Sequence, residues 1–207
     1  MKSRTLHRLG LAAALALLAG CASTSAPVVA ETPGCLSNVA VDRLLADYNA
    51  RRPAANPPET LTMADAHCSR SKLQQRLAGQ AGRLVGYKAG LTNPAVQKRF
   101  NTDQPVWGAL YSAMILNSGV TLDAGFGSRP LYEADLLVRV KDKAINDAAT
   151  PAQVLAQALK AQGLALRPGQ VVSLGSFSAL LPPKAGLKVT VHYDGVPGLQ
   201  PATVSFK

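Results

Sequence analysis

Residues 131–140 read Leu-Tyr-Glu-Ala-Asp-Leu-Leu-Val-Arg-Val, and every second side chain from Tyr132 to Val140 is apolar. An alternation with a period of two is typical of a β-strand that buries one of its faces. The acidic residues Glu133 and Asp135 then share the opposite face of the strand. Two carboxylates at this spacing repel each other unless a positive group lies between them.

Helical patterns dominate the chain before this strand, and strand patterns dominate after it. Capping boxes at Thr62 and Thr150 open helices that end at Gly79 and Gly163, the second with Pro151 in its first turn. Further helices are expected over 41–48 and 95–100, and further strands over 84–89, 171–174, 187–193 and 203–206. This order predicts an α+β fold, with N-terminal helices followed by a mixed, mostly antiparallel β-sheet in a single domain over 35–207.

The start of the chain has the composition of an export signal. Three basic residues precede an apolar run over 9–18, which is typical of a secretory signal peptide over 1–20. The run leads into Leu-Ala-Gly-Cys, which resembles the lipobox of bacterial lipoproteins, so we expect diacylation of Cys21 and a flexible tether over 21–34. The protein is then expected in the cell envelope, lipid-anchored and facing the periplasm. Ala22, in place of an inner-membrane retention aspartate, favours the outer membrane.

The chain is basic, with 22 Lys and Arg against 12 Asp and Glu. These charges form no cluster and have no aromatic ladder beside them, and export separates the protein from nucleic acid. They therefore indicate attraction to anionic lipid or simple solubility, and nucleic-acid binding is excluded. Cys35 and Cys68 follow the signal, and an oxidising periplasm would allow them to pair, although two free structural thiols remain the alternative.

Several common catalytic sites are missing from the sequence. It contains no phosphate-binding glycine loop and no G-x-S-x-G elbow, and only His67 and His192 follow the signal. Histidine zinc clusters and Ser-His-Asp triads are therefore excluded. The carboxylates of Glu133 and Asp135 are hard oxygen ligands that suit Mg²⁺ or Mn²⁺, but taken alone the pair is better explained as a solvated strand face.

Four further segments decide between a metal site and a solvated strand face, because they resemble segments of a known protein family. They are Gly86-Tyr-Lys-Ala-Gly-Leu-Thr-Asn-Pro-Ala-Val-Gln97, Asp103-Gln-Pro-Val-Trp-Gly108, Pro168-Gly-Gln-Val-Val172 with Gly175-Ser176, and Ala185-Gly186. Together with Glu133-Ala-Asp135 they resemble, in order and spacing, the 2-keto-4-pentenoate hydratase branch of the fumarylacetoacetate hydrolase family. The resemblance implies that family's β-sheet roll.

The resemblance also implies a chemistry. A divalent ion, Mg²⁺ or Mn²⁺, held by Glu133 and Asp135 would chelate a small 2-oxo acid and stabilise its dienolate, before water adds to the alkene. Lys88 would shuttle a proton or orient the enol, with Asp103 beside it. The Gly175-Ser176 loop would receive the substrate carboxylate.

The sequence departs from the family pattern after the acidic strand. The family's third metal ligand lies on a later strand, and no acidic residue of this chain is placed like it. The segment between Asp135 and Pro168 is short, with a break near 154–157, so the roll is expected to be incomplete and metal binding to be weak. An exposed sheet edge or cavity would need to be covered by rearrangement or by a partner chain, which a homo-oligomer would supply. A second departure is Leu174 in place of threonine, and a milder one is Asp135 in place of glutamate, since aspartate is still a hard oxygen donor.

Two functions remain open from the sequence. The first is a divalent-metal-dependent hydratase acting on a 2-oxo-4-enoate such as 2-hydroxypenta-2,4-dienoate, or a related decarboxylase or C–C hydrolase. The second is an envelope lipoprotein that retains part of the fold and is catalytically impaired or not an enzyme.

The lipobox makes the first testable prediction. Replacing Cys21 by Ser removes the thiol that would be acylated, so labelling with a radioactive fatty acid should be abolished and the protein should leave the membrane fraction. A Cys35→Ser variant is the control and should still be labelled. Persistent labelling of the Cys21→Ser protein would contradict the lipoprotein interpretation.

Overall fold

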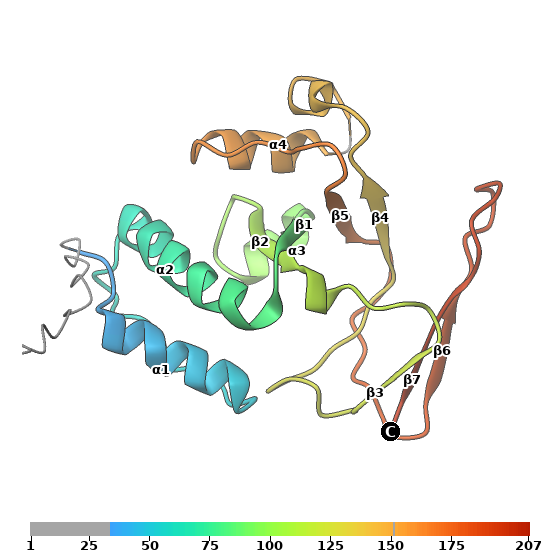
Figure 1. The fold of residues 1–207 in the computed structure, drawn as a ribbon, viewed down its shortest axis with the longest axis horizontal. Coiled ribbons are helices and arrows are strands. Elements are labelled where there is room, and N and C mark those ends of the chain that lie inside the picture. The colour runs from blue at the N-terminus through green and yellow to red at the C-terminus, as the bar shows by residue number, and fades with distance from the viewer. Residues whose placement is uncertain (1–33, 151) are drawn as a thin grey trace, which may run out of the picture. The chain divides into compact units, whose positions relative to one another are not determined.

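The computed structural model describes residues 34–150 and 152–207; the export signal, Cys21 and nearly all of the expected tether lie outside them. The helices are α1 (Asn38–Asn49), α2 (Met63–Ala81), α3 (Pro94–Arg99) and α4 (Gln153–Lys160), with 3₁₀ turns η1 (Ser112–Met114) and η2 (Lys143–Asn146). The strands are β1 (Leu84–Gly90), β2 (Val106–Tyr111), β3 (Val120–Leu122), β4 (Asp135–Arg139), β5 (Val171–Ser176), β6 (Lys188–Val191) and β7 (Ala202–Phe206), as Figure 1 shows. Among the described helices, none is long and apolar enough to cross a bilayer.

The second helix begins as predicted and ends later. Thr62 accepts a hydrogen bond from the backbone N–H of Asp65, whose carboxylate accepts one from the Thr62 N–H, so the capping box is confirmed. The helix continues through Gly79 and ends at Ala81, so the predicted end is wrong by two residues. Gly82 sets the true end, because it adopts φ +83°, a conformation that glycine takes far more readily than other residues.

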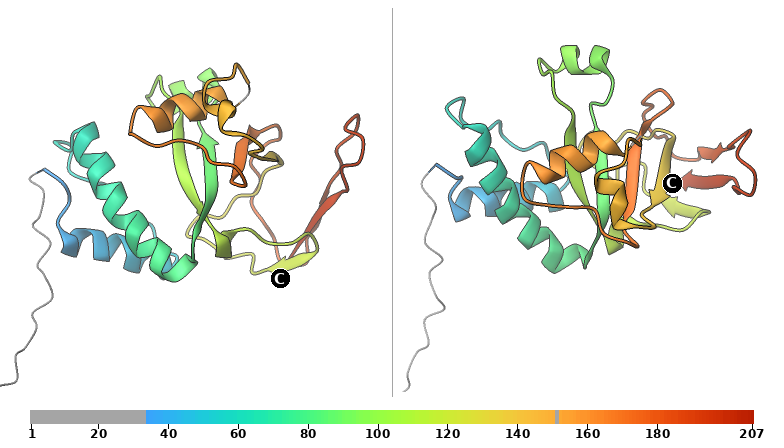
Figure 2. Two further views of the ribbon diagram at one scale, coloured as in Figure 1. Left: turned by 45° about the horizontal axis from the view of Figure 1, so that its top comes forward. Right: turned by 90° about the horizontal axis from the view of Figure 1, so that it is seen from above.

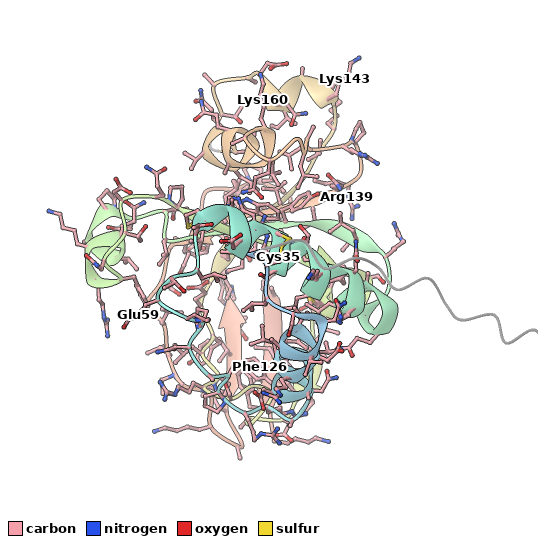
Figure 3. The ribbon with its side chains drawn as sticks, turned by 90° about the vertical axis from the view of Figure 1, so that its left-hand side faces the viewer. Cys35, Glu59, Phe126, Arg139, Lys143 and Lys160 are labelled. Carbon is pink, nitrogen blue, oxygen red and sulfur yellow. A yellow bond between two sulfur atoms is a disulfide. The ribbon has the colours of Figure 1, made fainter. Side chains whose placement is uncertain are left out.

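A disulfide fastens the start of the described chain to α2. Cys35, labelled in Figure 3, is bonded to Cys68, which is the first of the two alternatives for these cysteines. Two hydrogen bonds lie beside it: the Leu36 N–H donates to Ser69 Oγ at 2.9 Å, and Lys72 Nζ donates to the Leu36 carbonyl at 2.9 Å. The segment before α1 is therefore held both covalently and by polar contacts.

Four strands form the larger sheet in the order β2-β1-β5-β4, with β1 and β5 parallel and the outer pairs antiparallel. Gly86 permits the central pairing, because a Cβ there would clash with the Val171 carbonyl oxygen. The register then places Lys88 opposite Ser173. A second sheet has the order β3-β7-β6, with β3 and β7 parallel and β6 and β7 antiparallel. The predicted mixed, mostly antiparallel α+β class is thus confirmed.

The prediction of one continuous strand over 131–140 is wrong for the first half of this segment. Only Asp135–Arg139 forms β4, and the register shifts between Asp135 and Leu137. Tyr132 instead exchanges backbone hydrogen bonds with Leu181 at 2.9 and 3.0 Å, and its ring lies 5.6 Å from that of Phe206. These tertiary contacts pair the start of the segment with the chain that follows β5, and they place Tyr132 beside the second sheet.

Helix α4 covers one face of the larger sheet, as both views in Figure 2 show. Leu155 and Leu159 are buried in one core with Tyr87 of β1 and Val172 of β5. Val154, on the same helix, is 47% exposed. The core therefore depends on a narrow stripe of this helix that includes Leu155 and Leu159 but not Val154.

The second predicted capping box is wrong. The N-cap of α4 is Ala152, which has no side chain able to cap, and the Thr150 Oγ1 is buried without a hydrogen-bond partner among the described residues. The Thr150 backbone is instead part of a turn, in which its carbonyl accepts from the Gln153 N–H at 2.8 Å. Thr150 thus lies two residues before the N-cap position, too early to cap the helix.

The burial of α4 predicts a large cost for one truncation. Leu159 is fully buried, so Leu159→Ala should lower the free energy of unfolding by about 3 kcal/mol through lost apolar contact and the cavity left behind. Val154→Ala on the same helix is the matched control and should change it by less than about 0.5 kcal/mol. Urea unfolding of both variants measures the difference, and equal costs would contradict this packing.

Candidate active site

The candidate site is built around Lys88, near the middle of β1. Its Nζ donates to Glu133 Oε1 at 2.7 Å and to Asp135 Oδ2 at 3.2 Å, so one ammonium group bridges two carboxylates. The sequence alternation predicted that these carboxylates share a face, and both reach the same cation. The positive group that such a pair requires is therefore part of the chain itself.

Asp135 is held by more than the lysine. Its Oδ1 accepts the backbone N–H of Gly175 at 3.1 Å, and its Oδ2 also accepts the hydroxyl of Ser173. Both oxygens thus have donors from β5. A carboxylate with this many donors is fixed in direction, so Asp135 is the rigid member of the pair.

The environment of Lys88 favours its charged form. Burial opposes the ammonium, but the hydrogen bonds and charges of Glu133 and Asp135 outweigh it and raise the pKa of Lys88 above its ordinary value. The side chains of Lys88, Glu133 and Asp135 are 43%, 20% and 11% exposed. One ammonium facing two carboxylates leaves this half-buried cluster with an excess of negative charge.

The loop after β1 packs against the end of β5. Leu91 adopts φ +53°, and its carbonyl accepts a hydrogen bond from Gln97 Nε2 at 2.7 Å. Thr92 then lies against Gly175, where an added Cβ would come within 2.8 Å of the Thr92 Oγ1. Gly175 also has φ +112°, so both its backbone conformation and its surroundings require glycine.

Ser176 and Asp103 differ in their relation to the cluster. Ser176 Oγ donates to the carbonyls of Ala134 and Ser178, at 3.2 and 2.9 Å, so it ties β5 to the segment that carries Glu133. Asp103 is exposed in the turn before β2, and no hydrogen bond or ion pair joins it to Lys88. The expectation that Asp103 lies beside Lys88 therefore has no contact in the structure to support it.

Sequence reasoning missed Ser173. This residue lies between the apolar Val172 and Leu174 on β5, is 3% exposed, and donates its hydroxyl to Asp135. The available signal was a small polar residue inside an otherwise apolar strand. Buried hydroxyls need a partner, so such a residue predicts a polar neighbour on the adjacent strand.

The pair of carboxylates fits a divalent ion in its chemistry, and the small number of protein ligands limits how tightly the ion would be held. Glu133 and Asp135 supply the hard oxygens that Mg²⁺ prefers, and Mg²⁺ commonly keeps several waters and takes one or two carboxylates. Among the described residues, no group of three or more His, Cys, Asp and Glu side chains could hold a metal ion. The pair is therefore suited to a loosely held ion.

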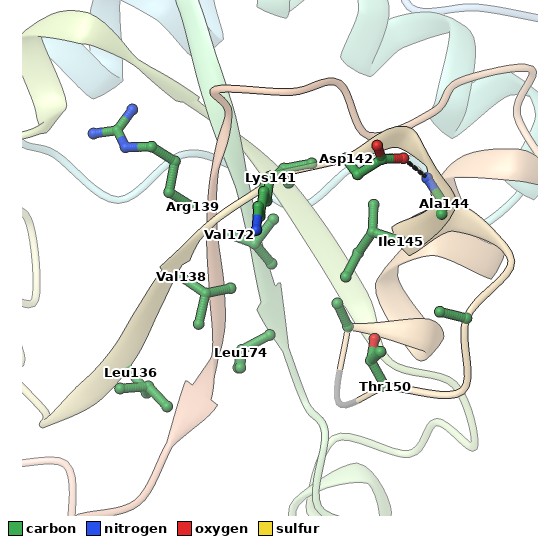
Figure 4. A pocket seen from close by; sticks show the side chains of 13 residues that line it. Leu136, Val138, Arg139, Lys141, Asp142, Ala144, Ile145, Thr150, Val172 and Leu174 are labelled. Carbon is green, nitrogen blue, oxygen red and sulfur yellow. Dashed lines mark hydrogen bonds between the residues drawn. The ribbon is translucent and has the colours of Figure 1, made fainter. Parts of the chain in front are cut away.

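Among the cavities of the described residues, two near the larger sheet bear on the position of the site. A groove of about 710 Å³ has Glu133 and Leu137 on one wall and apolar residues of the second sheet, such as Val189 and Val204, on the other. A second, apolar pocket of about 510 Å³ lies between β4, β5 and η2, where Figure 4 labels Val172. Since successive strand residues face opposite sides, this pocket and the Lys88 cluster are on different faces of the sheet. Of these two cavities, the groove borders the candidate site.

Comparison with known proteins finds no family model that matches the chain. Among curated proteins it is similar to 2-keto-4-pentenoate hydratase of Burkholderia vietnamiensis, 43% identical over 54 residues, which are 26% of this chain and 21% of the relative. It is also similar to 2-hydroxypent-2,4-dienoate hydratase of Pseudomonas putida, 34% identical over 91 residues, which are 44% of this chain and 40% of the relative. The matches thus span less than half the length of these relatives.

Solved structures share the architecture. 4-Oxalocrotonate decarboxylase from Pseudomonas putida G7, complexed with magnesium and adipate, superposes with a TM-score of 0.66 at 16% identity, over 82% of this chain and 96% of that chain. The same enzyme complexed with calcium and acetate gives a TM-score of 0.65. Identity this low shows the fold alone. The chain therefore has the α+β fold of 4-oxalocrotonate decarboxylase.

Proposed function

We propose that this chain is a lyase of the fumarylacetoacetate hydrolase family that adds water to a 2-oxo-4-enoate, such as 2-hydroxypenta-2,4-dienoate. The observation that carries the proposal is the Lys88 ammonium held between Glu133 and Asp135. The hydratase names of the relatives and the fold shared with 4-oxalocrotonate decarboxylase support it.

The reaction requires proton movement and a sink for negative charge. Protonation of the dienol at C5 gives an alkene conjugated with the 2-oxo group; water then adds at C4 and a proton goes to C3, which yields a 4-hydroxy-2-oxo acid. Negative charge develops on the 2-oxo oxygen while water adds. A fixed cation beside that oxygen lowers the barrier, because it stabilises the transition state more than the ground state.

The residues of the cluster divide these tasks. Lys88 is the cation that would donate a hydrogen bond to the 2-oxo oxygen, and Glu133, the less constrained carboxylate, would accept and return a proton. Asp135 would act as a positioning residue, because its contacts to β5 fix the carboxylate that Lys88 contacts. A divalent ion held by Glu133 and Asp135 would supply Lewis-acid polarisation of the same oxygen.

The proposal predicts turnover that depends on Lys88. We expect the purified protein to consume 2-hydroxypenta-2,4-dienoate slowly, since the described cluster offers a metal ion two carboxylates. Lys88→Ala should reduce the rate by about 10²–10³-fold. The measurement is the loss of dienol absorbance, with Mg²⁺ or Mn²⁺ added and without. Lys98→Ala, on α3 away from the cluster, is the control and should keep the wild-type rate.

The same assay distinguishes the hydratase from the alternative, an envelope lipoprotein without catalytic activity. A folded protein with no turnover under any metal condition would contradict the hydratase proposal and favour the envelope lipoprotein without catalysis. Equal rates in the wild type and in Lys88→Ala would contradict the role of Lys88. Circular dichroism on each variant establishes that the comparison is between folded proteins.

A further inference from the structure

The Lys88 ammonium occupies the place between the two carboxylates that a cation would take. Lys88 Nζ lies 2.7 Å from Glu133 Oε1 and 3.2 Å from Asp135 Oδ2, both within hydrogen-bonding distance. A divalent ion shared by the same two carboxylates would need the same space. It would also repel the ammonium strongly, because the site is half-buried and weakly screened.

Of the three side chains, Lys88 is the one able to leave. Its side chain is 43% exposed and has a flexible four-carbon stem, whereas Glu133 is 20% exposed and Asp135 11%. Asp135 also keeps its bonds from Ser173 and Gly175 when the lysine moves. The carboxylates would therefore stay in place, and the lysine would swing towards solvent.

We infer that Lys88 and a divalent cation are alternative occupants of the Glu133–Asp135 pair, so that cation binding frees Lys88 to contact the substrate. This inference deepens the proposed function, because it couples the loading of the site to the release of its polar catalytic group. It also explains why the wild-type pair should hold a metal weakly. An incoming ion must first break two charge-assisted hydrogen bonds.

Titration without substrate tests the inference. Calorimetry with Mg²⁺ and with Mn²⁺ should show weak binding to the wild type and at least about tenfold tighter binding to Lys88→Met, which has a similar length but no charge. Lys88→Arg keeps a cation between the carboxylates and should bind as weakly as the wild type. Lys141→Met removes the same charge at an exposed position after β4, so it measures the general effect of net charge and should also resemble the wild type.

Melting temperatures provide a second readout. Removing Lys88 leaves two carboxylates facing each other, so without metal the melting temperature of Lys88→Met should be lower than that of the wild type. Addition of Mn²⁺ should raise the melting temperature of Lys88→Met by more than it raises that of the wild type. Lys88→Gln, whose amide still donates a hydrogen bond, serves if the methionine variant does not fold, and it should also bind more tightly than the wild type. Adding Glu133→Gln to either variant should remove both the tighter metal binding and the larger rise in melting temperature.

Equal or weaker affinity in Lys88→Met and Lys88→Gln would overturn the inference, as would an equal gain in Lys141→Met. Absence of metal binding in every variant would overturn it as well, because the carboxylates would then be no cation site. None of these measurements uses the substrate. Failure of the hydratase assay therefore leaves this test intact, and failure here leaves the Lys88-dependent reaction open.

Discussion

The ion cluster of Lys88, Glu133 and Asp135 is the interaction on which the candidate site depends. It joins β1 to β4 across the intervening strand β5, whose Ser173 and Gly175 donate hydrogen bonds to Asp135. Without the ammonium, two half-buried carboxylates would face each other at short range, and their repulsion would separate the segment before β4 from the sheet. The same contact therefore shapes both the local fold and the charge of the site.

Backbone geometry places this cluster. Gly86 lets β1 and β5 approach closely, which sets Lys88 opposite Ser173. The left-handed Leu91 and the positive φ of Gly175 then bring the ends of both strands together. A site assembled from neighbouring strands in this way needs few residues, which is consistent with short stretches of identity to the hydratases and a fold shared over a much longer part of the chain.

Local patterns predicted some of these features, and tertiary contacts decided the rest. The alternation over 131–140 correctly put Glu133 and Asp135 on one face, but it could not reveal that Tyr132 pairs with Leu181, far along the chain. The Thr62 capping box formed because its partners are three residues apart, whereas Thr150 was drawn into a turn before α4. Ser173 was missed because its partner lies on another strand. The family resemblance suggested Asp103, but the structure places it in an exposed turn.

The most direct test of the central claim is nuclear magnetic resonance of the lysine side-chain ¹⁵Nζ groups in the metal-free protein. If Lys88 bridges Glu133 and Asp135, its ammonium protons should exchange slowly enough to give a resolved signal at neutral pH, and that signal should disappear in a Glu133→Gln, Asp135→Asn double variant. A Lys88 ammonium that exchanges as fast as the exposed Lys141, in the wild type as in the double variant, would contradict the account.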